Sequence, residues 1–168
     1  MNMNIEVAGK SDIEELTAVE IESKRQSIPG YIDAVEIDYA LRLHRWRTYF
    51  NKESPKSSKP ERVILKAVID SHIAGYIAGH LTNRYEMDAE IQSFYILINY
   101  QRNGIGKSLL MKFVEWLNGH QAKRLCVGIA KGNKYQAFYL KFGGKHLNEH
   151  WIYWDDLNVL QKILFTPR

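Results

Sequence analysis

The sequence predicts a mixed α/β (α+β) fold, in which a mostly antiparallel sheet of about six to seven strands carries about four helices on its faces. Two observations lead to this expectation. Three segments between residues 63 and 98 show the period-two pattern and β-branched residues of strands, with only turns between them. A glycine-containing turn then leads into a strongly periodic helix at Ile105. Folds in which strands and helices alternate throughout do not place three strands in succession.

The elements before the glycine turn follow from periodicity and breakers. Residues 5–8 are expected to form a strand, and Ser11 or Asp12 to cap a helix with an apolar stripe that ends before Pro29-Gly30. A second helix is expected over 34–49, and a polar loop over 51–62. Strands over 63–69 and 73–81 form a hairpin around a turn at 70–72, and a further strand covers 89–98.

After the helix that begins at Ile105 and ends near Gly119, the pattern predicts a strand over 124–130. A short helix over 134–142 is stopped by Gly143-Gly144. Two closing strands are then expected, over 145–153 and 159–165.

Length and composition limit the class of protein. The 168 residues are expected to form one domain, 1–168, large enough to bury a sizeable core. The single cysteine, Cys126, lies in an apolar run and is expected to be a buried thiol, which suits a reducing cytoplasm. The first residues lack a signal-peptide pattern, and no apolar run is long enough to cross a bilayer. We therefore expect a soluble cytoplasmic protein with no membrane partner.

The net charge of +4 comes from basic residues that are scattered along the chain. They do not form the stripe, interleaved with aromatic residues, that is typical of nucleic-acid-binding domains. Nucleic acid is therefore not the partner we expect. The oligomeric state is left open by the sequence, although a homodimer is the common closed assembly of soluble proteins.

The turn before the strongest helix carries Gly104 and Gly106. A helix N-terminus has unpaired N–H groups and a partial positive charge, and glycines let a ligand approach the backbone, so this turn suits phosphate oxygens. A strand-to-helix turn without a ligand is the plainer alternative. A nucleotide-binding P-loop would need glycine at Gln101, and a dinucleotide fingerprint would need glycine at Leu109.

The spacing Gln101-x-x-Gly104-x-Gly106 resembles the pyrophosphate-binding signature of the GNAT superfamily of N-acetyltransferases. The order of the flanking elements is similar as well. This resemblance implies that acetyl-CoA is the co-substrate and that its pyrophosphate binds the loop. It also implies that the strand before the loop runs beside the pantetheine arm. The implied cofactor-binding residues are Phe94, Tyr95, Ile96, Gln101, Arg102, Asn103, Gly104, Ile105, Gly106 and Lys107.

Residues 137–143 resemble the second signature of the family, whose tyrosine faces the sulfur of coenzyme A. Tyr139 is the matching residue, and its phenol would act as a general acid that protonates the departing thiolate. A tyrosine packed at a helix rim is the structural alternative. The family usually has an asparagine seven residues before this tyrosine, where the chain has Gly132, so the adjacent Asn133 becomes the candidate cofactor contact.

An amine acceptor must lose a proton before it attacks, and Glu90 is the candidate base. Many family members carry acidic residues at the positions matching 90 and 92, and this chain departs from that pattern with Gln92 at the second. Strict alternation would place Glu90 on one strand face with Gln92, Phe94 and Ile96. An exposed carboxylate at the strand end is the alternative, and His80 and His146 are further candidate bases. The resemblance also implies that a backbone N–H near Tyr95 or Ile96 meets the oxyanion.

Two groups of residues are candidates for the acceptor pocket. Asp33, Glu36 and Asp38 could form an amine-binding wall, although acidic residues in a first helical turn also compensate the helix dipole. The aromatic candidates, which could equally be core or rim residues, are Trp46, Tyr49, Trp151, Tyr153 and Trp154.

The expected function is therefore direct acetyl transfer from acetyl-CoA to a primary amine of a small molecule or peptide, without a metal. The alternative is a non-catalytic acyl-CoA-binding or regulatory module of the same fold.

Overall fold

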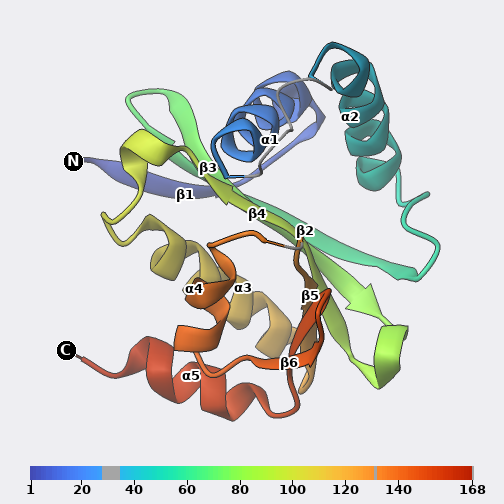
Figure 1. Ribbon diagram of the computed structural model, residues 1–168, viewed down its shortest axis with the longest axis vertical. Helices are drawn as coiled ribbons and strands as arrows, with labels where there is room; N and C mark the ends of the chain where they lie inside the picture. Colours follow the sequence, from blue (N-terminus) through green and yellow to red (C-terminus); the bar gives the residue numbers. More distant parts are fainter. Residues whose placement is uncertain (28–34, 131, 168) are drawn as a thin grey trace.

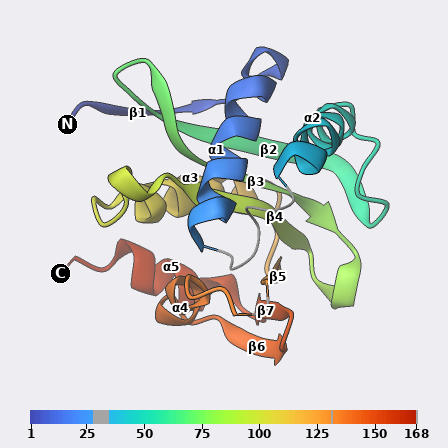
Figure 2. The same cartoon turned by 45° about the horizontal axis from the view of Figure 1, so that its top comes forward.

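The computed structural model describes residues 1–27, 35–130 and 132–167. One twisted sheet runs through the molecule, with strand order β1-β2-β3-β4-β5-β7-β6 (Figures 1 and 2). Its neighbours pair antiparallel, except β4 and β5, which are parallel. The strands are β1 Met3–Val7, β2 Ser58–Ile69, β3 His72–Thr82, β4 Ala89–Ile96, β5 Leu125–Gly128, β6 Lys145–Asn148 and β7 Trp151–Trp154. The predicted mixed, mostly antiparallel fold is confirmed.

Five α-helices cover the two faces of the sheet in the described part of the chain, one more than expected: α1 Ile13–Ser27, α2 Val35–Phe50, α3 Ile105–Gly119, α4 Gln136–Lys141 and α5 Leu157–Phe165. Helices α1 and α2 lie on one side of the sheet, and α3, α4 and α5 lie on the other (Figure 1). The larger core forms under α3, whose Leu109, Leu110 and Phe113 are fully buried. A second core, with Leu16 and Trp46, forms under α1 and α2. Each face of the sheet therefore has its own apolar layer.

The prediction of a strand over 159–165 is wrong, because this segment is the helix α5. Its buried residues are Leu157, Leu160 and Leu164, whose spacing of three and four places them on one helical face. The Asp156 side chain accepts a hydrogen bond from Asn158 N at 2.9 Å and caps the first turn. The two β-branched residues of the segment, Val159 and Ile163, are both exposed.

Two further predictions need correction. The single strand expected over 145–153 is a hairpin of β6 and β7, which pair antiparallel around a turn at Glu149 and His150. The polar loop expected over 51–62 ends early, since β2 begins at Ser58. Arg62 stabilises this polar start of the strand, because its guanidinium donates to the backbone oxygens of Tyr49 and Ser54 at 2.9 and 2.8 Å. The other strands and helices agree with the predicted ones to within a few residues at each end.

Candidate functional site

Strands β4 and β5 separate after a short parallel ladder. Their pairing covers Ala89, Glu90 and Ile91 of β4, and β4 then continues to Ile96 without a partner on that edge in the described residues. On its other edge, β4 pairs with β3 as far as Ile96, and Leu97 N donates to Ala74 O at 2.9 Å. In an antiparallel ladder, the N–H and C=O groups of successive residues point alternately towards the paired strand and away from it. The backbone N–H and C=O groups of Phe94 and Ile96 therefore point away from β3, into the opening between β4 and β5. The register thus favours Ile96 over Tyr95 for a backbone donor in this opening.

A β-bulge in β4 changes which side chains share a face. Ser93 pairs with Ala78 while Ile91 pairs with Gly79, so Gln92 is an extra residue. Phe94 and Ile96 pack in the core under α3, whereas the Glu90 carboxylate lies 3.4 Å from His80 Nε2, on the α2 side. The prediction that strict alternation groups Glu90 with Phe94 and Ile96 is therefore wrong, and the bulge is the physical reason.

The glycine loop ends β4 and opens α3. Gly104 is the N-cap residue of α3, with φ +78° and no side chain to cap the helix, and its surroundings are open. The first amides of α3 therefore keep the donor capacity that an anion could use. Arg102, Asn103 and Gly104 are exposed, and Lys107 is half-buried one turn into the helix. The loop thus presents backbone donors and two cations to solvent.

Two other loop residues have structural contacts. Gln101 Nε2 donates to Ile96 O at 2.9 Å, so this side chain ties the loop to the end of β4. Gly106 is buried, and a Cβ at this position would lie 3.0 Å from Ile96 Cδ1 and 3.3 Å from Phe138 Cε2. A larger residue would push α3 away from β4 and α4. Gly106 therefore sets the distance between the glycine loop and the strand.

Tyr139 lies on α4, on the same side of the sheet as Phe94. Its ring centroid is 6.3 Å from that of Phe94 and 6.1 Å from that of Trp154. Burial, with a smaller contribution from Tyr95, raises the pKa of Tyr139 above its ordinary range. The phenol therefore stays protonated at neutral and moderately alkaline pH. It is a proton donor held by aromatic packing next to the strand that lines the opening.

Asn133 precedes α4 and is half-buried. Its Oδ1 accepts a hydrogen bond from Tyr135 N at 2.9 Å, and its backbone N–H donates to Ala130 O. The side-chain oxygen therefore stabilises the turn before α4. The amide NH₂ group is the part of Asn133 that is left for a ligand.

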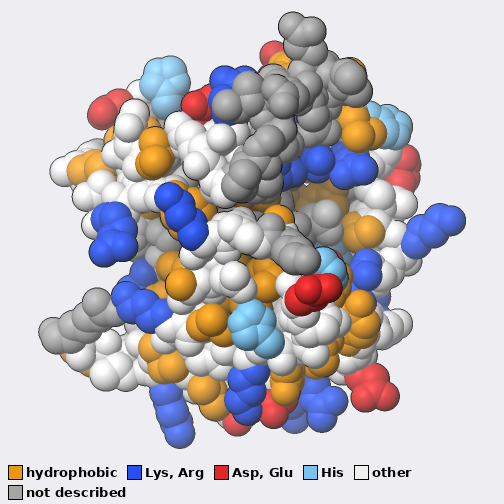
Figure 3. All heavy atoms as spheres, viewed as in Figure 1, with side chains coloured by type: hydrophobic (Ala, Val, Ile, Leu, Met, Phe, Trp, Pro, Cys, Tyr) orange, Lys and Arg blue, Asp and Glu red, His pale blue; other side chains and the backbone are white. Residues whose placement is uncertain are grey.

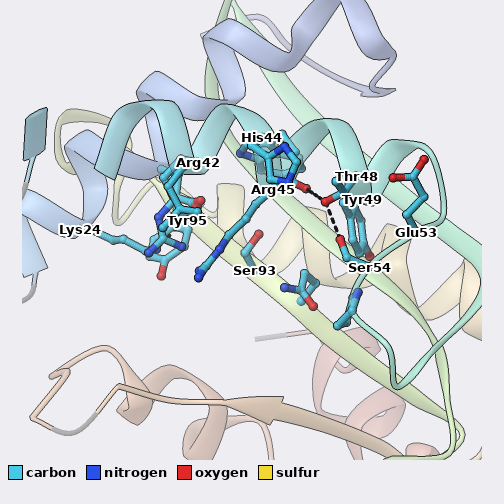
Figure 4. A pocket seen from close by; sticks show the side chains of 15 residues that line it. Lys24, Arg42, His44, Arg45, Thr48, Tyr49, Glu53, Ser54, Ser93 and Tyr95 are labelled. Carbon is cyan, nitrogen blue, oxygen red and sulfur yellow. Dashed lines mark hydrogen bonds and ion pairs between the residues drawn. The ribbon is translucent and has the colours of Figure 1, made fainter. Parts of the chain in front are cut away.

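A cleft of about 600 Å³ lies on the other face, between α1, α2 and β4. Figure 3 shows this part of the surface as a hollow bordered by Lys and Arg side chains next to α2. Trp46 and Tyr49 line it, as do Gln92, Ser93 and Tyr95 of β4. Arg45 reaches from α2 across the cleft towards Ser93 (Figure 4). The cleft opens beside the unpaired part of β4, so an acceptor bound there would lie next to the opening.

The remaining pocket candidates lie elsewhere. Trp151 packs against Tyr85 and Arg84, and Trp154 is buried, with Nε1 donating to Phe142 O at 3.0 Å. Tyr153 does not line the cleft either. His146 is exposed on β6. Asp33 and the side chains of Glu36 and Asp38 are outside the described residues.

Glu90 belongs to a buried polar cluster below the cleft. Its Oε2 accepts a hydrogen bond from Arg84 Nε at 3.1 Å and lies 3.4 Å from His80 Nε2. His80 Nδ1 lies 3.1 Å from Tyr49 Oη. The candidate base is thus a buried, ion-paired carboxylate rather than an exposed one at a strand end. Glu90 itself does not line the cleft.

Several residues of the site carry no clear signal in the sequence. Lys24, Arg42 and Arg45 line the cleft, and the helical spacing of 42, 45, 46 and 49 is the one pattern that could have grouped them. Arg84 lies in a 3₁₀ turn, Arg84–Glu86, and only the fold brings it to Glu90. In the residues that the structure describes, no group of three His, Cys, Asp or Glu side chains could hold a metal ion. Nor does any described helix have the length and apolar character that crossing a membrane requires.

Residues 27–144 match the family model described as the acetyltransferase (GNAT) family. The chain belongs to this family. The GNAT protein described here is also 25% identical to YuaI of Bacillus subtilis (strain 168), an uncharacterized N-acetyltransferase, over 96% of this chain and 98% of YuaI. The family resemblance noted in the glycine loop is thereby confirmed.

Solved GNAT structures share the fold. The PaiA N-acetyltransferase of Thermoplasma acidophilum, in complex with coenzyme A, matches with a TM-score of 0.70 and 21% identity, over 91% of this chain and 98% of PaiA. A GNAT family acetyltransferase of Brucella melitensis, in complex with acetyl-CoA, matches with a TM-score of 0.57 and 20% identity. That match covers 91% of this chain and 87% of the Brucella protein.

Proposed function

We propose that residues 1–168 form one acetyl-CoA-dependent N-acetyltransferase domain, which moves the acetyl group directly to a primary amine of a small molecule or peptide. One observation carries the proposal, namely what surrounds the end of β4 that does not pair with β5. The glycine-capped helix α3 follows it, the Tyr139 phenol packs on one of its faces, and the cleft lies on the opposite face. Two proteins of similar fold are complexes with coenzyme A or acetyl-CoA, which supports the choice of co-substrate.

The residues of the loop fit a pyrophosphate group. Gly104, which caps α3, and Arg102 are exposed, and Lys107 lies half-buried one turn into the helix; a helix N-terminus binds anions through its first amides. Gln101 holds the loop against Ile96, so we assign it a positioning role. Backbone groups of Phe94 and Ile96 would bind the pantetheine amides, in the way an added strand binds a sheet edge. Asn133 would bind the same arm through its free NH₂ group.

Catalysis would combine three contributions from this chain. The N–H of Phe94 or Ile96 would donate to the oxyanion, an interaction worth roughly 10²- to 10³-fold in rate. Tyr139 would donate its proton to the leaving thiolate, since its raised pKa keeps the phenol protonated. Glu90 would receive the proton of the amine. If the amine has the pKa of lysine, about 10.4, only roughly one molecule in 2,500 is neutral at pH 7, so such a base matters.

Turnover of acetyl-CoA with a panel of primary amines tests the proposal, with release of the coenzyme A thiol as the readout. We expect release that depends on an amine, together with a rise in melting temperature on adding acetyl-CoA but not ATP or NAD. Stabilisation by acetyl-CoA without turnover of any amine would instead support the non-catalytic acyl-CoA-binding module. A lack of both effects would contradict either function. The cytoplasmic location and the homodimer stay predictions.

A further inference from the structure

A continuous row of polar side chains leads from the cleft to Glu90. Tyr49 lines the cleft, and its Oη lies 3.1 Å from His80 Nδ1. On the other side of the ring, His80 Nε2 lies 3.4 Å from Glu90 Oε2. His80 is 0% exposed, Tyr49 3% and Glu90 5%, so the row runs through the interior.

The burial of Glu90 raises a question about its proposed task. An acceptor in the cleft meets Tyr49 but not Glu90, which does not line that space. His80 Nε2 has no hydrogen bond of good geometry in the described part of the chain, although it is fully buried. When Nδ1 accepts from the Tyr49 hydroxyl, Nε2 carries the ring proton, and a donor that faces a carboxylate at 3.4 Å needs only a small movement to make that bond.

We propose that Tyr49 and His80 relay the proton of the acceptor amine to Glu90. This inference rests on the proposed acetyltransferase function. The ammonium nitrogen gives a proton to Tyr49 Oη, while the Tyr49 hydroxyl proton moves to His80 Nδ1 and the His80 Nε2 proton moves to Glu90 Oε2. The amine and Glu90 become neutral, Tyr49 keeps a proton, and His80 changes tautomer. Reverse transfer to water in the emptied cleft restores the starting state.

The charged and titratable groups around the row are consistent with such a relay. Burial raises the pKa of Tyr49 far above its ordinary range, so its phenol passes a proton on rather than acting as an anion. The Arg62 guanidinium of β2 lies 4.6 Å from the centre of the Tyr49 ring. Arg84 pairs with Glu90 and balances its charge. On β5, the buried thiol of Cys126 has its pKa raised to about 12 by burial and by Glu90, so it stays neutral.

The test compares two acceptors of similar shape, one amine with a pKa near 10 and one with a pKa near 7. Tyr49→Phe keeps the ring and breaks the row. We expect kcat/KM at pH 7 to fall about tenfold or more for the basic amine and less than about twofold for the weakly basic one. His80→Gln should give the same pattern. Tyr76→Phe removes another buried hydroxyl from the same core and should change neither rate by more than about twofold.

A purely structural role for the row predicts equal losses of kcat/KM for both amines, and that result would overturn the relay. An unchanged kcat/KM in Tyr49→Phe would overturn it as well. Stabilisation by acetyl-CoA, measured on each variant, shows that the fold and the cofactor site are intact. If the unaltered protein acetylates no amine, the proposed function fails, and the relay with it. If the unaltered protein is active and the losses do not depend on the amine, only the relay fails.

Discussion

The replacement Tyr139→Phe isolates the proposed general acid. It removes one oxygen and keeps the ring, which packs against Phe94, Phe138 and Trp154 with centroid distances of 5.7–6.3 Å. No hydrogen bond of the Tyr139 hydroxyl is found in the described residues, so the free energy of unfolding should change by less than about 1 kcal/mol. The variant therefore tests chemistry rather than folding.

The expected loss follows from the leaving group. General acid catalysis typically gives 10²- to 10⁴-fold, but a thiolate with a conjugate-acid pKa of about 8.5 leaves tolerably well without help. We expect kcat to fall about tenfold to a hundredfold, which is about 1.4 to 2.7 kcal/mol in the barrier. Burial raises the pKa of Tyr139, so the phenol stays the proton donor as pH rises from 7 to 10. The rates of variant and unaltered protein should keep a constant ratio over that range.

Single-turnover release of the coenzyme A thiol is the appropriate assay, because slow product release would hide the chemical step in kcat. Acetyl-CoA affinity should stay within a few-fold, as read from the rise in melting temperature. An unchanged single-turnover rate would refute the general-acid role. A loss of acetyl-CoA affinity that accounts for the whole effect would instead make Tyr139 a binding residue.

Three further predictions concern the loop, the base and the buried thiol. Gly104→Val should abolish stabilisation by acetyl-CoA, because valine is strained at φ +78° and covers the exposed amides of α3. The control Gly119→Val, at the open far end of the same helix, should retain that stabilisation. Equal behaviour of the two variants would rule out the loop as the binding site. Glu90→Gln should lower the rate most at neutral pH and recover as pH approaches the pKa of the free amine, whereas a pH profile parallel to that of the unaltered protein would leave Glu90 without a role as base. Burial raises the pKa of Cys126 from an ordinary 9.0 to about 12, so the stability from this thiol is complete below pH 9 and is lost as pH rises from 9 to 12. The loss at pH 10 amounts to about 1.4 kcal/mol relative to pH 7, and urea titrations of Cys126→Ala should lack this decline between pH 7 and 10.

The glycine loop and α3 could be predicted from the sequence because their signals are local. The two glycines sit at the helix start, and Leu109, Leu110 and Phe113 repeat at helical spacing and are all buried. Gly104 adopts the left-handed φ that a non-glycine residue disfavours. Local conformation and burial pattern agree here, so sequence alone identifies the element that carries the family signature.

Other features depend on contacts between distant residues. Helix α5 is not one of them, because the Asp156 cap and the helical spacing of Leu157, Leu160 and Leu164 are local signals that the strand prediction over 159–165 missed. The contacts of Glu90 with Arg84 and His80 join three different elements. The separations of Arg84 and His80 from Glu90 along the sequence match no pattern that would predict these contacts. The depth of the candidate base was therefore not predictable.

The bulge at Gln92 has a consequence for the proposed chemistry that a regular strand would not allow. Before the bulge, the Glu90 side chain points towards α2, and after it, the backbone of Phe94 and Ile96 points into the opening next to β5. If β4 paired regularly, Glu90 would share a face with Phe94 in the apolar core under α3, where an unpaired carboxylate is costly. In the proposed function, one extra residue would thus let a single strand serve the acceptor cleft with its side chains and the cofactor with its backbone. Deleting Gln92 should therefore abolish acetylation more completely than Glu90→Gln does, because it moves the base to the wrong face as well.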